Sequence, residues 1–170
     1  MPNERSREQT LEAQTVVTKA RALAAAGQFA AVVEFLGTRE RGELVGSPTL
    51  ALLYGIAQAR LGRHEQGLEW LEHARSQAHQ QGEHIVERHA LSARGAIALV
   101  SGELSEAADY CTQALMAASR DGDHATTGRA SNNLGNISHL HGRFAEAIAS
   151  WEIAAAMASA TEKCVTCRRH

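Results

Sequence analysis

The stretch from Ser131 to Ala154 reads SNNLGNISHLHGRFAEAIASWEIA. Gly135 interrupts a run of helix-forming residues, and Gly142 follows seven residues later. The same pair recurs at steps of 40 residues, as Gly95 with Gly102 and as Gly55 with Gly62. A fixed period of this length predicts that the chain is built from repeated supersecondary units.

A second register of glycines marks the ends of the helices. Six glycines follow one another at intervals of 20 residues: Gly42, Gly62, Gly82, Gly102, Gly122 and Gly142. Glycine is the preferred residue just past a helix end, because it adopts a left-handed conformation without a steric penalty. Each interval is therefore one helix with its turn, and two intervals make an antiparallel hairpin. We expect hairpins at about 6–37, 48–81, 84–121 and 124–160, within one domain that spans residues 1–160.

Three further glycines, Gly55, Gly95 and Gly135, fall in the middle of the expected helices. Glycine inside a helix costs about 1 kcal/mol relative to alanine. Because this cost recurs at one phase of the repeat, we expect a neighbouring helix to cross there with no room for a side chain.

The first hairpin departs from the period. Gly27 precedes Gly62 by only 35 residues, so the second helix of this hairpin is expected to end early. The segment 38–47, TRERGELVGS, is interpreted as an irregular linker, and Pro48 then opens the next helix. Asp123 is expected to cap the helix that follows Gly122.

The composition favours an all-α protein of closely packed helices. Hydrophobic residues make up 44% of the chain but aromatic residues only 4%, and alanine supplies much of the apolar content. Lys and Arg number 17 against 19 Asp and Glu, which gives a net charge of −2. Nucleic-acid binding needs a clustered positive surface, and the sequence holds no such block, so we expect no nucleic-acid partner.

The sequence also argues against a membrane role. No stretch approaches the roughly 20 apolar residues of a membrane-spanning helix. The first ten residues, MPNERSREQT, lack the apolar region of a signal peptide. The three cysteines, Cys111, Cys164 and Cys167, are too few and too unevenly placed for a disulfide framework. A cytoplasmic location is therefore expected.

The motifs of enzymes and cofactor sites are missing from the sequence. It has no glycine-rich phosphate loop, no G-x-S-x-G elbow and no pair of histidines spaced as in a helical zinc protease. We expect no catalytic residues and no cofactor. Cys164, Cys167 and His170 supply three of the four ligands that a structural zinc ion needs, so no metal site is predicted. Residues 161–170 are expected to be a disordered tail or the start of a truncated further repeat.

The fourth hairpin resembles the tetratricopeptide repeat. Leu134, Gly135, Ala147 and Trp151 match its pattern, with Phe144 in the Gly-x-aromatic position. Ser131 and Ser138 depart from it, since the family has Trp and Tyr there, and the closing Pro is absent. The 40-residue period is similar to that of the branch found in kinesin light chain, spindle-orientation adaptors, and bacterial regulators and sensors. The resemblance implies a right-handed α-solenoid of about four hairpins that binds a protein or peptide segment in its concave groove.

A polar face on the first helix of the fourth hairpin is the candidate site. Its members are Arg129, Asn132, Asn133, Asn136 and His139, joined by His89 and Ser92 at matching positions of the third hairpin. The resemblance implies that Arg129, Asn133 and Asn136 hold a peptide backbone. Asparagine is a poor residue for a helix interior, so three of them so close together favour a binding role. The alternative is a solvated helix face that binds nothing.

Two further hypotheses concern partners. Ile148, Trp151 and Ala155 share one face of the last helix, and we expect self-association through that face, or further repeats that cover it. The 20-residue rhythm also predicts a turn near Glu162 and a new helix near Cys164. The alternative to a general interaction scaffold is a peptide-sensing module of a larger bacterial transcriptional regulator or signalling protein.

Overall fold

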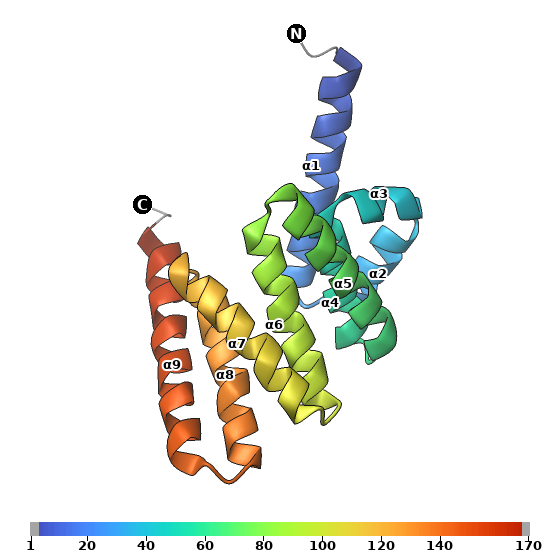
Figure 1. Ribbon diagram of the computed structural model, residues 1–170. Helices are drawn as coiled ribbons and strands as arrows, with labels where there is room; N and C mark the ends of the chain where they lie inside the picture. The colour runs from blue at the N-terminus through green and yellow to red at the C-terminus, as the bar shows by residue number, and fades with distance from the viewer. Residues whose placement is uncertain (1–3, 168–170) are drawn as a thin grey trace. The chain divides into compact units, whose positions relative to one another are not determined.

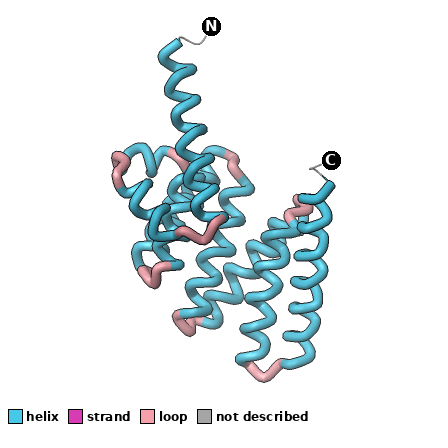
Figure 2. Tube along the Cα trace, turned by 180° about the vertical axis from the view of Figure 1, so that it is seen from behind, coloured by secondary structure: helices cyan, strands magenta, loops and turns pink. Residues whose placement is uncertain are grey.

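The computed structural model describes residues 4–167, and the side chains of residues 11–161. Residues 4–167 form nine α-helices and no strand (Figures 1 and 2). In chain order the helices are α1 (Glu4–Ala25), α2 (Phe29–Gly37), α3 (Arg41–Gly46), α4 (Pro48–Arg60), α5 (His64–Gln81), α6 (His84–Val100), α7 (Leu104–Arg120), α8 (His124–Leu140) and α9 (Phe144–Cys167). The all-α class and the succession of helical hairpins are confirmed. The chain divides into two compact units, residues 1–86 and 87–170.

Glycines with positive φ end the helices, as the 20-residue register predicts. Gly27, Gly62, Gly82, Gly102, Gly122 and Gly142 have φ between 67° and 81°. Gly42 is the exception, because it lies inside α3 and φ is not positive there. The prediction that Gly42 ends a helix is therefore wrong.

The segment 38–47 is not wholly irregular, so that prediction is wrong for residues 41–46. These residues form α3, whose Leu44 is buried in the core of the first unit. One apolar anchor gives this six-residue helix a fixed position against its neighbours. Ser47 then caps α4 by accepting a hydrogen bond from the backbone N–H of Leu50 at 3.4 Å, and Pro48 takes the first helical position.

The expected turn near Glu162 is absent. Helix α9 continues from Phe144 to Cys167 without a break, so residues 161–167 are neither irregular nor the start of a new helix. The physical reason lies in the composition, because no glycine or proline follows Gly142 and alanine-rich segments propagate a helix readily.

The first unit is built on apolar side chains from α1 to α4. Its buried core comprises Val16, Ala20, Val32, Leu36, Leu44, Leu50 and Ala57. Helix α5 packs along α4. A Cβ placed on Gly55 would lie 3.0 Å from Leu71 Cγ and 3.1 Å from the carbonyl oxygen of Gly67. The close crossing expected at Gly55 is confirmed.

In the second unit, two more glycines in the middle of helices allow neighbouring helices to cross closely. A Cβ on Gly95 of α6 would lie 2.6 Å from Cys111 Sγ on α7, and one on Gly135 of α8 would lie 2.6 Å from the Trp151 ring on α9. Helix α8 lies beside both α7 and α9 (Figure 1). Four small residues of α7 are buried: Ala107, Cys111, Ala114 and Ala118. Because alanine side chains are small, α7 packs closely against its neighbours, as the composition predicts.

Candidate partner-binding site

The candidate polar face lies on α8 in the second unit, next to α6. Arg129, Asn132 and His139 are exposed along α8. The guanidinium of Arg129 donates to Thr126 Oγ1 one turn earlier, at 2.9 Å. Thr126 is itself buried, so this bond restrains the exposed Arg129 side chain. These three residues present polar groups to the surroundings in a row along one helix.

Asn133 and Asn136 lie differently from what the sequence indicates. Asn136 Oδ1 accepts a hydrogen bond from Trp151 Nε1 at 3.1 Å, which ties α8 to α9. The Asn133 side chain lies beside the Cys111 thiol of α7 and lowers the pKa of that thiol, although burial has the larger effect and raises it to about 11. Both residues are half-buried. Each amide therefore has one role inside the hairpin stack, and since an amide carries both a donor and an acceptor, Asn136 keeps an amide nitrogen that this bond does not use.

Of the two α6 residues expected at the site, Ser92 is buried and His89 is held in place. Ser92 is only 4% exposed, so it cannot line an open surface, and its assignment is corrected. It stands on the buried side of α6, between Arg88 and Gly95. His89 Nε2 lies 3.2 Å from Asp123 Oδ2, and the ring is part-buried. The burial of His89 and the nearby Arg129 charge lower its pKa, although Asp123 opposes them, so the ring is neutral at neutral pH.

An ion-pair network behind this face was not predicted from the sequence. Arg88, only 6% exposed, donates from Nη1 to Asp121 at 2.6 Å and from Nε to Asp123 at 2.9 Å. Asp123 also caps α8 by accepting from the backbone N–H of Thr126 at 3.0 Å, as expected. Burial alone would raise the pKa of Asp123, but hydrogen bonds from Arg88 and Thr126 hold it well below its usual range. Arg88 lies more than 30 residues from both partners, a separation at which no local pattern predicts a pair.

Aromatic residues gather at the end of the candidate face. The ring centroid of His139 lies 5.6 Å from that of Phe144 and 5.7 Å from that of Trp151. Leu140 and Phe144 are both exposed beside this cluster. Phe144 was identified only as a motif residue, yet its exposure makes it a candidate contact for a partner.

The outer face of α9 is apolar but does not include Trp151. Ile148 and Ile153 are 54% and 47% exposed, and Ala155 is exposed as well. Trp151 turns toward α8, where Gly135 and Asn136 meet it. The expected face therefore keeps Ile148 and Ala155, which lie seven residues apart on one side of α9, but loses Trp151, and the exposed Ile153 lies on a different side of the helix.

The described residues contain neither a membrane-spanning helix nor a cluster of metal-ligating side chains. Among these residues no helix is long and apolar enough to cross a membrane. Within the same part of the chain, no three His, Cys, Asp or Glu side chains gather as a metal site would require. The side chains of Cys164 and Cys167, and all of His170, lie outside the described residues.

No protein-family model matches the chain, and no curated protein matches it. Among solved structures, the chain is similar to one described as MamA MSR-1 C2, with 16% sequence identity and a TM-score of 0.38 over 89% of this chain and 99% of that one.

Proposed function

We propose that this chain is an interaction scaffold that binds a segment of another protein on the face shared by α6 and α8. The observation that carries the proposal is the row of exposed polar side chains on α8, Arg129, Asn132 and His139, next to the exposed Phe144. In an alanine-rich chain, such a row offers hydrogen bonds and ring contacts to an extended peptide.

The network behind this face supports the proposal physically. Arg88, Asp121 and Asp123 join α6 to the turn before α8, and Asn133 and Asn136 join α8 to its other neighbours. A surface held in this way loses little conformational entropy when a partner binds, which favours affinity. Asn132 is the amide best placed to pair with the peptide backbone, because it is exposed and Asn133 and Asn136 are half-buried.

A peptide-sensing module of a larger regulator would use the same face. In that form of the proposal the bound segment is a free signalling peptide instead of part of a partner protein. The proposed location of the scaffold is the cytoplasm, and its action is non-catalytic.

The test is a peptide selection followed by variants of the face. Peptides selected from a displayed library on the purified chain would be measured by calorimetry against the wild type and the Arg129→Ala/Asn132→Ala double variant. We expect the double variant to bind about tenfold or more weakly, since lost hydrogen bonds cost about 1–3 kcal/mol.

Gln113→Ala is the matched control, because Gln113 is an exposed amide on α7 in the same unit. It should bind like the wild type. If all selected peptides bind the double variant with wild-type affinity while circular dichroism shows an intact fold, the α6–α8 face is not the binding site.

A further inference from the structure

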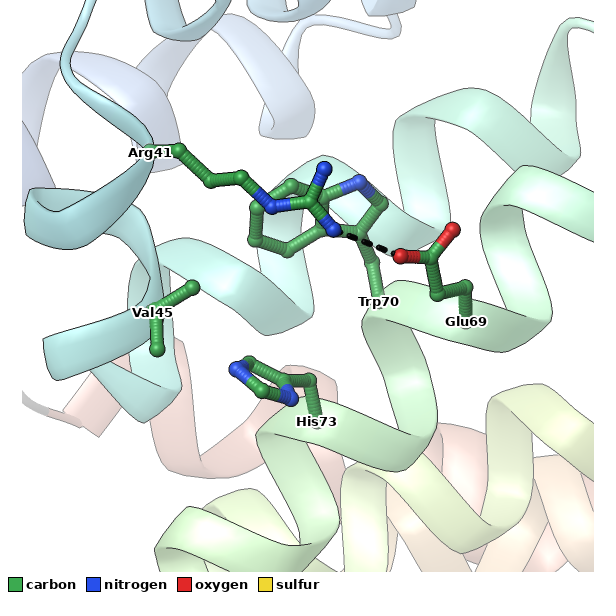
Figure 3. A pocket seen from close by; sticks show the side chains of 5 residues that line it. All are labelled: Arg41, Val45, Glu69, Trp70 and His73. Atoms are coloured by element: carbon green, nitrogen blue, oxygen red, sulfur yellow. Dashed lines mark hydrogen bonds and ion pairs between the residues drawn. The ribbon is translucent and has the colours of Figure 1, made fainter.

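A pocket opens in the first unit, at the place where the repeat is irregular. It has a volume of about 230 Å³ and lies between the short helix α3 and the helix α5. Five side chains line it, as Figure 3 shows: Arg41, Val45, Glu69, Trp70 and His73. Because α3 is absent from the other hairpins, the pocket belongs to this irregular part of the repeat and shares no residue with the α6–α8 face.

Arg41 and Glu69 form an exposed ion pair over the pocket. Arg41 Nη2 lies 2.7 Å from Glu69 Oε1, and the two side chains are 74% and 63% exposed. The guanidinium also stands 5.5 Å from the centre of the Trp70 ring (Figure 3). A solvent-exposed pair contributes little net stability, so an incoming anion displaces Glu69 from Arg41 at little cost.

His73 supplies a buried polar atom that is not satisfied. Its Nε2 has no hydrogen-bond partner among the described residues, although it is shielded from solvent. The ring projects from α5 toward Val45 at the side of the pocket (Figure 3). Its contact with Trp70, at 6.2 Å between ring centroids, and the contact of Trp70 with Tyr54, at 5.1 Å, hold the two rings in place. A buried ring nitrogen without a partner is unfavourable, so a ligand that hydrogen-bonds to it gains free energy.

The charges that line the pocket and its volume indicate which chemical class of ligand it binds. A purely apolar group would leave His73 Nε2 unpaired. A cation would have to displace Arg41 from Glu69 and Trp70. Because Arg41 belongs to the same chain, its effective concentration beside these two side chains is high. A carboxylate matches the planar fork of Arg41 and accepts a hydrogen bond from His73, and its carbon chain packs on Val45 and Trp70. The volume is below the roughly 300–1,000 Å³ of pockets for drug-sized ligands, so it takes a group as small as one side chain.

We propose that this pocket binds a carboxylate on a short carbon chain, held by Arg41 and His73 against Trp70. The acidic side chain of a partner protein and a small free carboxylic acid share this chemistry. The site does not depend on the α6–α8 face, so each proposal stands or fails alone.

Nuclear magnetic resonance of the full ¹⁵N-labelled chain tests the proposal. The signals to follow are the Trp70 indole N–H and the His73 ring nitrogens, assigned with Trp70→Phe and His73→Phe. We expect N-acetyl-glutamate methylamide and acetate to shift both signals saturably, whereas the uncharged N-acetyl-glutamine methylamide leaves them in place. Arg41→Gln should weaken this binding about tenfold or more.

Arg39→Gln is the matched control. Arg39 also forms an exposed ion pair, with Glu43, and removing it changes the net charge equally. Arg129→Ala/Asn132→Ala should leave this binding unchanged, which separates the pocket from the α6–α8 face. An acidic peptide that binds tighter than the blocked glutamate identifies a partner side chain as the ligand, and equal affinity identifies a free acid. Equal responses to glutamate and glutamine, or equal losses in Arg41→Gln and Arg39→Gln, overturn the proposal.

Discussion

Gly55, Gly95 and Gly135 show how single residues set the packing of this chain. Each lies in the middle of a helix, and a Cβ at each position would approach the neighbouring helix to 3.0 Å or less. The sequence contains this information because a repeated glycine in a helix needs a steric reason. The atoms that fill the space, such as the Trp151 ring over Gly135, could not be named before the structure.

Gly135→Ala is expected to destabilise the protein. The added Cβ would meet Trp151 Cδ1 and Nε1 at 2.6 Å and the Ala147 carbonyl oxygen at 3.2 Å. The indole hydrogen-bonds to Asn136, so it cannot move away freely. Overpacking costs about 1–3 kcal/mol, which exceeds the gain of about 1 kcal/mol in helix propensity. Urea unfolding of the two proteins measures the difference.

Gly42→Ala serves as the control for that measurement. Gly42 is also helical, and nothing in the described structure lies within 4 Å of a Cβ placed there. This variant should match the wild type or exceed its stability. A Gly135→Ala protein that is more stable than the wild type would contradict the close crossing of α8 and α9.

The polar residues of the candidate face were less predictable than the glycines. Periodicity places Arg129, Asn132, Asn133, Asn136 and His139 near one another on α8. It does not say which amides serve neighbouring helices, because that depends on the Cys111 thiol and the Trp151 indole. Ser92 was misassigned because a small hydroxyl fits a buried helix face as readily as a polar surface.

At the scale of helices, the glycine turns could be predicted from the sequence. The helix α3 and the continuation of α9 past Glu162 could not. Glycine after a helix end is a strong local signal, and six such glycines adopt positive φ. The helix α3 escaped prediction because six residues are too few to show a periodicity, and its position depends on the buried Leu44. The turn at Glu162 was predicted only from the 20-residue spacing of the glycines, and the sequence has no residue there that would end a helix.

The ion-pair network that joins α6 to the turn before α8 makes stability depend on pH. The pKa of His89 is lowered from 6.5 in the folded chain, first by burial. As pH falls below about 6.5, the unfolded chain takes up a proton at His89 that the folded chain does not, so stability is lost on acidification. The depressed pKa of Asp123 acts in the same direction at lower pH, because its stabilisation is present above 3.8 and lost as pH falls further.

Urea unfolding between about pH 5 and pH 8 tests this dependence. His89→Gln should flatten the decline in the free energy of unfolding, since glutamine does not titrate. His64→Gln, at the start of α5 in the other unit, provides a control for removal of a histidine. Identical pH profiles for the wild type and His89→Gln would exclude His89 as the source of the decline.

For the whole molecule, the class of fold followed from composition and rhythm, whereas the partner did not. Alanine content and the glycine period restrict the chain to stacked helical hairpins. A binding partner is recognised by side chains that need no fixed spacing, and the carboxylate pocket proposed at Trp70 depends on the helix α3, where the repeat is irregular.

Helix α9 is expected to mediate self-association. Between Ala147 and Thr161 the sole charged residue is Glu152, and the 54% exposed Ile148 shares one side of the helix with the exposed Ala155. A face with so little charge fits another uncharged apolar surface, and a second copy of α9 supplies one through the two-fold symmetry common in homodimers. Sedimentation over a range of concentrations should show a dimer for the wild type and a monomer for Ile148→Lys/Ala155→Lys.

Met116→Lys is the control for that double variant, because Met116 is an exposed apolar residue on α7, away from this face. It should dimerise like the wild type. Trp151→Glu is unsuitable, since Trp151 packs on Gly135 and its loss would disturb the α8–α9 hairpin itself. If the wild type sediments as a monomer at all concentrations, a second copy does not cover this face. If Met116→Lys is monomeric as well, an added positive charge prevents dimerisation wherever it is placed. The loss of the dimer would then not identify α9 as the interface.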